Sequence, residues 1–420
     1  MNKLKHLHQI IPLILIGLIL FSCQKEDIRP QTELKLSQEI SIATARKVAL
    51  NFSKKAHFYN KPDKDGSQLK SSVPGFEEKE INEVILIPDE NNSPSLYVVT
   101  FFPVGYVIIS ATLKESPILG YSEDAIFDFD KLPVGIAIWL VDRIDKIQIL
   151  KKSDTIHIPD EVVMQWSAMA PEEGDEEVIV SGPSEYEQKG PLLTTLWGQR
   201  DGYNTLLDRI NGSLPPTGCV ATAMAQVMKY HKFPTNYNWT AMPDYYGTTA
   251  TAQLMKDIGI TVHMEYGISA SGAYTETAKT ALKNTYGYSS SIQYVDYNVD
   301  VVVSELNSNR PVIMDAYHTY YTTSNGWWIF ANSTPHYEDG HTWVCDGFKR
   351  TINTTIHNPE TVYEYTTSFT SGYYLHMNWG ASGTGMGTVD NNGWFKFDNF
   401  LISNGYNFQF RKKCIVGIKP

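Results

Sequence analysis

The sequence has few cysteines, no long apolar run and no excess of positive charge. Four cysteines in 420 residues are too few for a disulfide scaffold, so each needs its own explanation. The formal net charge is −11, which argues against a dedicated nucleic-acid-binding protein, because such proteins carry a basic surface. Hydrophobic residues make up 42% of the chain and charged residues 19%, and this composition excludes wholesale disorder.

The charge is unevenly distributed along the chain. Residues 1–190 have a balance of −9, whereas residues 191–420 have a balance of −2. The total length suggests two or three domains at about 150 residues each. We therefore expect an N-terminal domain over residues 38–170, an acidic linker over residues 171–190 and a larger domain over the rest.

The first residues are typical of an export signal. Two lysines precede an apolar run of 12 residues, Ile10–Phe21, whereas a membrane-spanning helix needs about 20. The run ends in Ser22-Cys23, which resembles a bacterial lipobox, where the cysteine becomes the lipidated first residue of the mature chain. We expect a signal peptide over residues 1–22, a tether over residues 23–37 and a periplasmic or cell-surface lipoprotein. An ordinary signal peptide with an incidental cysteine is the alternative.

The two main regions differ in their predicted elements. Residues 38–170 resemble a small α+β unit without an evident nucleophile or metal-ligand cluster. Its expected helices and strands are 38–58, 83–87, 96–102, 105–110 and 132–150. Residues 191–420 begin with a helix of small and apolar residues and continue with strands over 312–316, 342–347, 372–379, 394–397 and 414–418. A large early helix followed by a sheet predicts an α+β fold.

Cys219 is the candidate nucleophile. Pro and Gly residues precede it and small apolar residues follow it, which predicts that the helix begins at the cysteine. A helix N-terminus stabilises a thiolate, and its free N–H groups can form half of an oxyanion hole. Gln199, in a polar loop upstream, could supply the second oxyanion donor. A buried core cysteine is the alternative.

His341 is the best candidate for the base that a thiolate nucleophile needs. It stands at the start of a predicted strand, where a histidine can reach a cleft from a fixed backbone. Asn378 could accept a hydrogen bond from the ring N–H and hold the tautomer, while Trp379 would cover that bond from water. His376 shares a strand face with Asn378 and is a rival base, although we expect it to be structural.

A zinc site formed by Cys219, His341 and Cys345 is a weaker interpretation, because no fourth ligand with zinc-like spacing is visible. Cys345 and Cys414 lie in apolar strands and fit core positions. We expect neither a metal nor an organic cofactor.

Taken together, these residues resemble the papain-like cysteine peptidases and, more closely, the streptopain-like family. The matching segments extend over most of residues 191–420: Trp197-Gly-Gln, Thr217-Gly-Cys-Val-Ala-Thr-Ala-Met, Gly340-His341, His376-Met-Asn-Trp-Gly and Val416-Gly-Ile-Lys-Pro420. Residues 105–111 and 117–122 resemble the inhibitory prodomain of that family. The resemblance implies a papain-like catalytic domain, with the nucleophile's helix packed on an antiparallel sheet, preceded by a small α+β prodomain.

The resemblance also implies an activity. The chain would be the zymogen of a cysteine endopeptidase that acts on proteins or peptides, needs a reductant and is inhibited by its own prodomain. Cys219 would be acylated, His341 would act as base and then as acid, and Gly340 would line the substrate site. We expect activation by a cut between residues 184 and 192, at the Lys189–Gly190 bond.

Two further points stay open. The segments 318–339 and 349–370 are longer than the family pattern predicts, and both flank the His341 strand, so substrate preference does not follow from the resemblance. A non-peptide amidase or acyltransferase could use the same Cys-His apparatus, and a catalytically silent surface-binding protein could keep the same fold.

Overall fold

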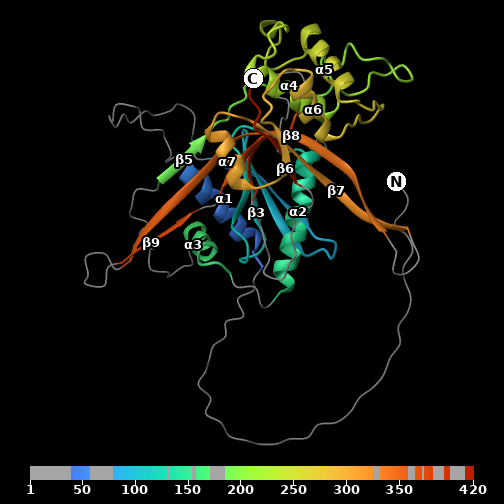
Figure 1. The fold of residues 1–420 in the computed structure, drawn as a ribbon. Coiled ribbons are helices and arrows are strands. Elements are labelled where there is room, and N and C mark those ends of the chain that lie inside the picture. Colours follow the sequence, from blue (N-terminus) through green and yellow to red (C-terminus); the bar gives the residue numbers. More distant parts are fainter. Residues whose placement is uncertain are drawn as a thin grey trace, which may run out of the picture. The chain divides into compact units, whose positions relative to one another are not determined.

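The computed structural model describes most of the chain after its N-terminal region (Figure 1). The described residues are 39–56, 79–129, 132–153, 158–170, 185–325, 332–357, 365–370, 373–381, 392–397 and 412–420. The chain divides into residues 1–37 and a compact unit over residues 38–420. The predicted signal peptide, Cys23 and the tether lie outside the described residues. Within the described residues, no helix has the length and apolar character needed to cross a membrane.

The structure confirms the predicted α+β class, with helices packed on an antiparallel sheet. The helices are α1 (Ile42–Ala56), α2 (Val134–Lys152), α3 (Asp160–Met169), α4 (Cys219–His231), α5 (Thr249–Thr261), α6 (Thr275–Asn284) and α7 (Val299–Asn307), with a 3₁₀ turn, η2 (Trp239–Ala241). The strands are β1 (Glu80–Pro88), β2 (Pro94–Phe102), β3 (Tyr106–Ser110), β4 (Ile118–Ser122), β5 (Glu185–Lys189), β6 (Gln293–Asp296), β7 (Val312–Asn325), β8 (Asn332–His357), β9 (Tyr365–Thr370), β10 (Tyr374–Asn378), β11 (Gly393–Lys396) and β12 (Lys413–Val416).

One sheet runs through both predicted domains. Its order is β1-β2-β3-β4-β11-β10-β8-β7-β12-β6, and β5 and β9 also pair with β8. The junction between the two regions is the pairing of β4 with β11, where Tyr121 faces Trp394. The division into residues 38–170 and 191–420 therefore stays a prediction, because the sheet is continuous across it. The predicted linker ends in β5, which pairs with β8.

The N-terminal strands are covered on both faces, as the alternation of β2 shows. Leu96 and Val98 belong to the same buried cluster as side chains of α2. Tyr97 and Val99 instead belong to a cluster with side chains of α1. Because successive side chains of a strand point to opposite faces, α1 and α2 lie on opposite sides of β2.

Helix α4 begins at Cys219, as the sequence predicts. Gly218 before it has a φ of 88°, a conformation that L-residues with a Cβ rarely adopt. A Cβ at this position would also lie 2.5 Å from the Met264 sulfur. From Val220 to Met228 every side chain of α4 is buried, so the helix is fixed by packing all round.

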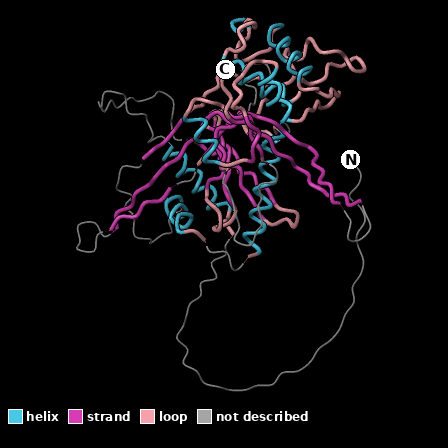
Figure 2. The backbone as a smooth tube through the Cα atoms, in the orientation of Figure 1, coloured by secondary structure: helices cyan, strands magenta, loops and turns pink. Residues whose placement is uncertain are grey.

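The two long segments beside the His341 strand are extensions of β8 at its two ends. Pairing of β7 with β8 continues to Asn325 and Asn332. Pairing of β8 with β9 continues to His357 and Tyr365. Figure 2 shows the two ribbons leaving the central sheet in different directions. The first ribbon begins beside Gly340, directly before the candidate base.

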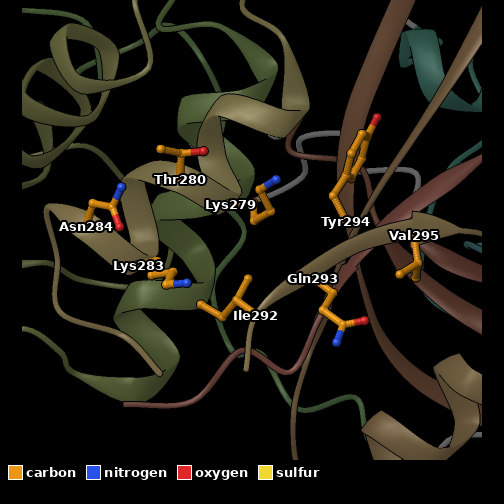
Figure 3. Close-up of a pocket in the computed structure, with 8 residues that line it drawn as sticks. All are labelled: Lys279, Thr280, Lys283, Asn284, Ile292, Gln293, Tyr294 and Val295. Carbon is orange, nitrogen blue, oxygen red and sulfur yellow. The ribbon is translucent and has the colours of Figure 1, made fainter. Parts of the chain in front are cut away.

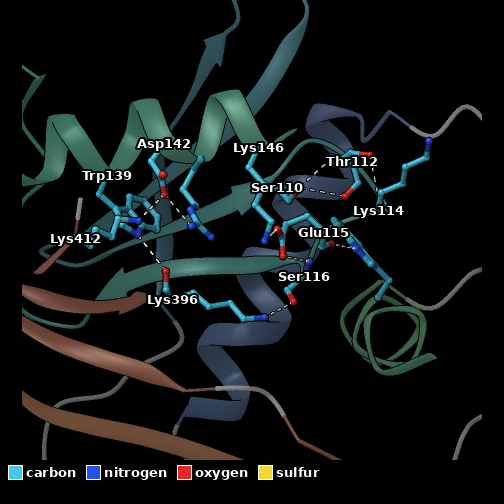
Figure 4. A network of polar contacts seen from close by, with 12 residues as sticks. Ser110, Thr112, Lys114, Glu115, Ser116, Trp139, Asp142, Lys146, Lys396 and Lys412 are labelled. Carbon is cyan, nitrogen blue, oxygen red and sulfur yellow. Dashed lines mark hydrogen bonds and ion pairs between the residues drawn. The ribbon is translucent and has the colours of Figure 1, made fainter. Parts of the chain in front are cut away.

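Buried charged groups connect the N-terminal region to the later strands (Figure 4). The Lys412 ammonium lies 2.9 Å from Asp142 of α2, and the indole of Trp139 donates to the Lys396 carbonyl at 3.1 Å. Glu115 is buried, which raises the pKa of its carboxyl, but the nearby Lys146, Lys396 and Arg143 lower it to about 2. Removing one member would leave a buried charge without its partner, at a cost of about 3–5 kcal/mol, so the charged groups of the two regions depend on each other.

Substitution of Gly218 tests whether the entry into α4 depends on glycine. We expect Gly218→Ala to lower the free energy of unfolding by about 1–3 kcal/mol through backbone strain and by about 1–3 kcal/mol more through crowding against Met264. Gly212→Ala is the matched control, because Gly212 also has a positive φ, of 82°, but has open space around it. Denaturant unfolding should show a larger loss of stability in Gly218→Ala than in Gly212→Ala. Equal losses in the two variants would contradict the expected crowding against Met264.

Candidate active site

The structure brings the side chains of Cys219 and His341 close enough for each to shift the pKa of the other. Burial raises the pKa of the Cys219 thiol, but the hydrogen bond and the charge of His341 outweigh it and lower the pKa below its ordinary value. Burial lowers the pKa of His341, and the Cys219 sulfur more than offsets this and raises it. Both shifts favour a thiolate beside an imidazolium, which is the reactive form of a cysteine nucleophile.

The backbone carbonyl of Trp379 orients the imidazole. His341 Nε2 lies 2.9 Å from this oxygen. A carbonyl oxygen can only accept, so Nε2 carries a proton and donates it. The other ring nitrogen, Nδ1, is therefore the one left to exchange a proton with Cys219.

The structure differs from the prediction at Asn378, which does not hold the imidazole. Its Nδ2 donates to the Thr195 carbonyl at 2.7 Å. Its Oδ1 accepts from Gln226 Nε2 at 3.1 Å and from the Gly380 N–H at 3.2 Å. The predicted acceptor is thus replaced by the next residue's carbonyl. Asn378 acts on the imidazole indirectly, because its bonds fix the backbone turn that presents this carbonyl.

Gln226 is a site residue that the sequence analysis missed. Its Oε1 accepts from the Thr195 hydroxyl at 2.9 Å and from the Trp197 N–H at 3.3 Å, and its Nε2 donates to Asn378. It lies seven residues after Cys219 on the same helix, two turns along the same face. A single amide in the buried stretch Val220–Met228, where Thr222 is the one other polar side chain, was the available signal.

The other predicted site residues lie close to the pair in the fold. The Gln199 carbonyl accepts from the Thr217 N–H at 2.9 Å, which holds its loop beside the turn before Cys219. Gly340 is exposed and directly precedes His341. Trp379 is fully buried, with its ring centre 5.0 Å from that of Trp343. The roles of Gln199 as an oxyanion donor and of Gly340 in substrate binding stay predictions.

The rival base and the other cysteines have structural surroundings. His376 Nδ1 lies 2.6 Å from the Asp346 carboxylate, which also accepts from the Leu193 N–H. Burial raises the pKa of Cys345 and raises that of Cys414 to about 12. Among the residues that the structure describes, no three His, Cys, Asp or Glu side chains form a group that could hold a metal ion.

The first turn of α2 lies directly on the candidate site. A Cβ added at Gly135 would be 2.2 Å from the Trp379 ring and 2.9 Å from the His341 ring. The backbone of the N-terminal region therefore touches the base itself, and this close approach requires glycine.

A separate pocket of about 460 Å³ lies between α6 and β6 (Figure 3). Its lining residues are Lys279, Thr280, Lys283, Asn284, Ile292, Gln293, Tyr294 and Val295. Cys219 and His341 do not line it, so its size says nothing about the room for substrate at the nucleophile.

Comparison with known proteins places these features in a family. The profile of the Peptidase C10 family matches residues 197–236 and 235–388, and the profile named Spi protease inhibitor matches residues 37–147. Streptopain of Streptococcus pyogenes serotype M28 is 25% identical over 410 residues, which cover 84% of this chain and 87% of that protein. The thiol protease/hemagglutinin PrtT of Porphyromonas gingivalis is 24% identical, over 75% of this chain and 36% of that protein. A prointerpain A fragment of Prevotella intermedia has a similar fold, with a TM-score of 0.54, 24% identity and coverage of 80% of this chain and 99% of that one.

A paired thiol and imidazole on this α+β fold, with an inhibitor-like segment before it, define a cysteine peptidase zymogen. Within that class, the matches to both the catalytic and the inhibitory profiles show a streptopain-like cysteine peptidase with a prodomain.

Two substitutions distinguish the carbonyl from the Asn378 side chain as the group that orients His341. We expect Asn378→Ala to lower the free energy of unfolding by about 1–3 kcal/mol, because buried donors and acceptors lose their partner, and to lower kcat by about tenfold or less. His341→Ala should abolish turnover. In the serine-protease triad, loss of the group that contacts the imidazole lowers kcat by about 10⁴, so a fall of that size in Asn378→Ala would contradict the carbonyl assignment.

The pH dependence of kcat/KM tests the thiolate–imidazolium pair. The pair exists above the pKa of Cys219, which is lowered from 9.0, and below the pKa of His341, which is raised from 6.5. We therefore expect a bell-shaped profile for the activated enzyme, with its acid limb below pH 9 and its alkaline limb above pH 6.5. A rate that rises to a plateau near the ordinary thiol pKa would contradict the pairing.

Proposed function

We propose that this chain is an exported cysteine endopeptidase made as a zymogen. The observation that carries the proposal is the Cys219–His341 pair, in which each side chain shifts the pKa of the other toward the charged form. The peptidase and inhibitor profiles that match the chain support a peptide substrate rather than another amide.

In the proposed mechanism, the Cys219 thiolate attacks the peptide carbonyl carbon. The Cys219 N–H at the start of α4, with the Gln199 amide, stabilises the negative charge on the carbonyl oxygen. His341 then donates its Nδ1 proton to the leaving amine, and a thioester forms. Water deprotonated by His341 releases the acid and restores the thiolate. These steps need only side chains and backbone groups of the chain itself.

The N-terminal region inhibits this site in the proposed zymogen. The first turn of α2 lies against the His341 and Trp379 rings, where substrate backbone would compete for space. The buried ion pair of Asp142 with Lys412 holds the helix in that position. The proposed activating cut is at Lys189–Gly190. Because Lys189 pairs with Phe348 of β8, this bond must first leave the sheet to fit the cleft of a protease.

We also propose that Cys23 carries a lipid anchor, on the basis of the lipobox-like sequence. Cys23 would leave with the N-terminal region after the cut, so activation would release the enzyme from the membrane. Detergent phase partitioning of the uncut and the cut chain, with Cys23→Ala as the control, tests this. An anchored Cys23→Ala chain, or an active fragment that stays in the detergent phase, would contradict it.

The central experiment compares the chain from residue 24 with its Cys219→Ala variant under reducing conditions. We expect the parent chain to process itself and to cleave casein, and the variant to do neither. A peptide-based thiol-trapping inhibitor should label Cys219. Labelling without casein cleavage would favour the amidase or acyltransferase alternative, and no labelling after prodomain removal would favour a silent binding protein.

Gly135→Ala tests how the N-terminal region covers the site. The added methyl group would overlap the Trp379 and His341 rings, so α2 must shift outward and inhibition should weaken. We expect uncut Gly135→Ala to hydrolyse a small peptide substrate faster than the uncut parent chain does, with cleavage blocked in both by Lys189→Pro. Enzymes cut from the same two chains without Lys189→Pro are the control: because residue 135 leaves with the N-terminal region, they have the same sequence and should have equal activity. Equal activities of the two uncut chains would show that this contact does not inhibit.

A further inference from the structure

An extended segment, residues 193–197, follows shortly after the proposed cut and passes the candidate site. Every second side chain of the segment is buried, with exposed or half-buried side chains between. This alternation is typical of an extended chain with one face against a core. The start of the segment is fixed, because the Leu193 N–H donates to the Asp346 carboxylate at 2.9 Å. The segment is therefore packed into the catalytic region, and it would be among the first residues of the cut enzyme.

Two buried amide side chains lie against this segment. Gln226 Oε1 accepts from the Thr195 hydroxyl at 2.9 Å and from the Trp197 N–H at 3.3 Å. Asn378 Nδ2 donates to the Thr195 carbonyl at 2.7 Å. The two amides also bond to each other, since Gln226 Nε2 donates to Asn378 Oδ1 at 3.1 Å. Gln226 is fully buried and Asn378 is 3% exposed, so bulk water does not compete for these bonds.

The backbone groups of the segment decide which way each amide points. A carbonyl oxygen can only accept a hydrogen bond, and an N–H can only donate one. The Thr195 carbonyl therefore requires the nitrogen end of Asn378, and the Trp197 N–H requires the oxygen end of Gln226. Turning either amide over would bring two donors or two acceptors together in a buried place, which is unfavourable. The segment thus selects one orientation of Asn378.

This orientation acts on the base through a single peptide group. The peptide between Trp379 and Gly380 directs its N–H to Asn378 Oδ1 at 3.2 Å and its carbonyl to His341 Nε2 at 2.9 Å. Because a peptide group is planar, an acceptor that fixes the direction of the N–H also fixes that of the carbonyl. Only the oxygen end of Asn378 can be this acceptor. The orientation of Asn378 therefore sets the orientation of the His341 ring.

We propose that Thr195 and Gln226 are positioning residues for the catalytic base, and that the segment 193–197 must stay on the enzyme after activation. Neither residue bonds to His341. Both act through Asn378 and the peptide group that follows it. The proposal rests on the proposed function in that it takes His341 as the base.

The first test follows the His341 ring without peptide turnover. It uses the full chain with Cys219→Ala, which should not cut itself, and NMR of 15N-labelled histidine gives the pKa of His341. The bond to the Trp379 carbonyl raises this pKa, so a carbonyl that is no longer held in place should lower it. We expect Gln226→Met to lower the pKa by about 0.5 to 1, the effect of one hydrogen bond. Thr195→Val should lower it by less, because Gln226 keeps its bond from the Trp197 N–H.

Thr194→Val is the matched control for this measurement. Thr194 lies in the same segment, but its side chain is exposed and belongs to none of these hydrogen bonds. The control should leave the pKa of His341 at the parent value. If Gln226→Met does not fold, Thr195→Val is judged by the same criterion, since it keeps the shape of the side chain and removes one hydroxyl. An unchanged pKa in the folded variants would overturn the proposal.

Kinetics of the cut enzyme test the route through Asn378. We expect Gln226→Met to lower kcat by about two- to tenfold with an unchanged KM, because the orientation of the base affects the chemical step. In an Asn378→Ala background the same substitution should have no further effect on kcat, since the link to the peptide group is already lost. Equal effects of Gln226→Met in both backgrounds would overturn the proposal.

The N-terminus of the active enzyme gives an independent test. We expect N-terminal sequencing of the fully active cut enzyme to show a chain that begins before Thr195. A fully active enzyme that begins after Thr195 would overturn the proposal, because the carbonyl that selects the Asn378 orientation would be gone. Since the NMR measurement needs no substrate, a chain without peptidase activity but with the expected pKa shifts would refute the proposed function alone.

Discussion

The contact between the first residue of α4 and the middle of β8 is the constraint on which the rest of the structure depends. The Cys219 sulfur must meet the His341 ring while the helix around it stays buried on all sides. Gly218 permits the sharp entry, because its φ of 88° would strain any residue that has a side chain, and a Cβ there would also crowd the end of the Met264 side chain. Packing therefore holds Cys219 and His341 together, since neither residue could move without opening the core between α4 and the sheet. The lowered pKa of Cys219 follows from this enforced proximity.

The sequence predicted those features of the fold and the site that depend on a few neighbouring residues. It predicted the fold class, the helix that begins at Cys219 and the segment that bears His341, because proline, glycine and hydrophobic periodicity act locally. It failed at Asn378, where an amide side chain was the obvious acceptor but a backbone carbonyl does the work. Every residue has a backbone carbonyl that can accept a hydrogen bond. The residue type therefore does not indicate which carbonyl contacts the imidazole. Gln226 was missed for a similar reason, because its importance comes from partners far away in the chain.

The N-terminal region has two roles in this structure: it completes the sheet, and it covers the candidate site. Its strands complete the sheet through the pairing of Tyr121 with Trp394, and its helix α2 puts Gly135 against the catalytic rings. Under the proposed activation, this region has to bind firmly and still leave after one cut. Buried charges let a segment leave more easily than an apolar interface would. Asp142 and Lys412 depend on each other while both are buried, yet each group is well solvated by water once they separate. An apolar interface of the same area would instead expose a hydrophobic patch on the released enzyme.

The base of the reactive pair has a support that does not change with pH. The Trp379 carbonyl oxygen lies 2.9 Å from His341 Nε2, and a carbonyl keeps its acceptor character at every pH. A titratable acceptor such as a carboxylate would lose its hydrogen bond to the imidazole in acid, whereas this carbonyl does not. The carbonyl therefore fixes the orientation of the ring, and the charge of the pair is set by the Cys219 and His341 side chains themselves.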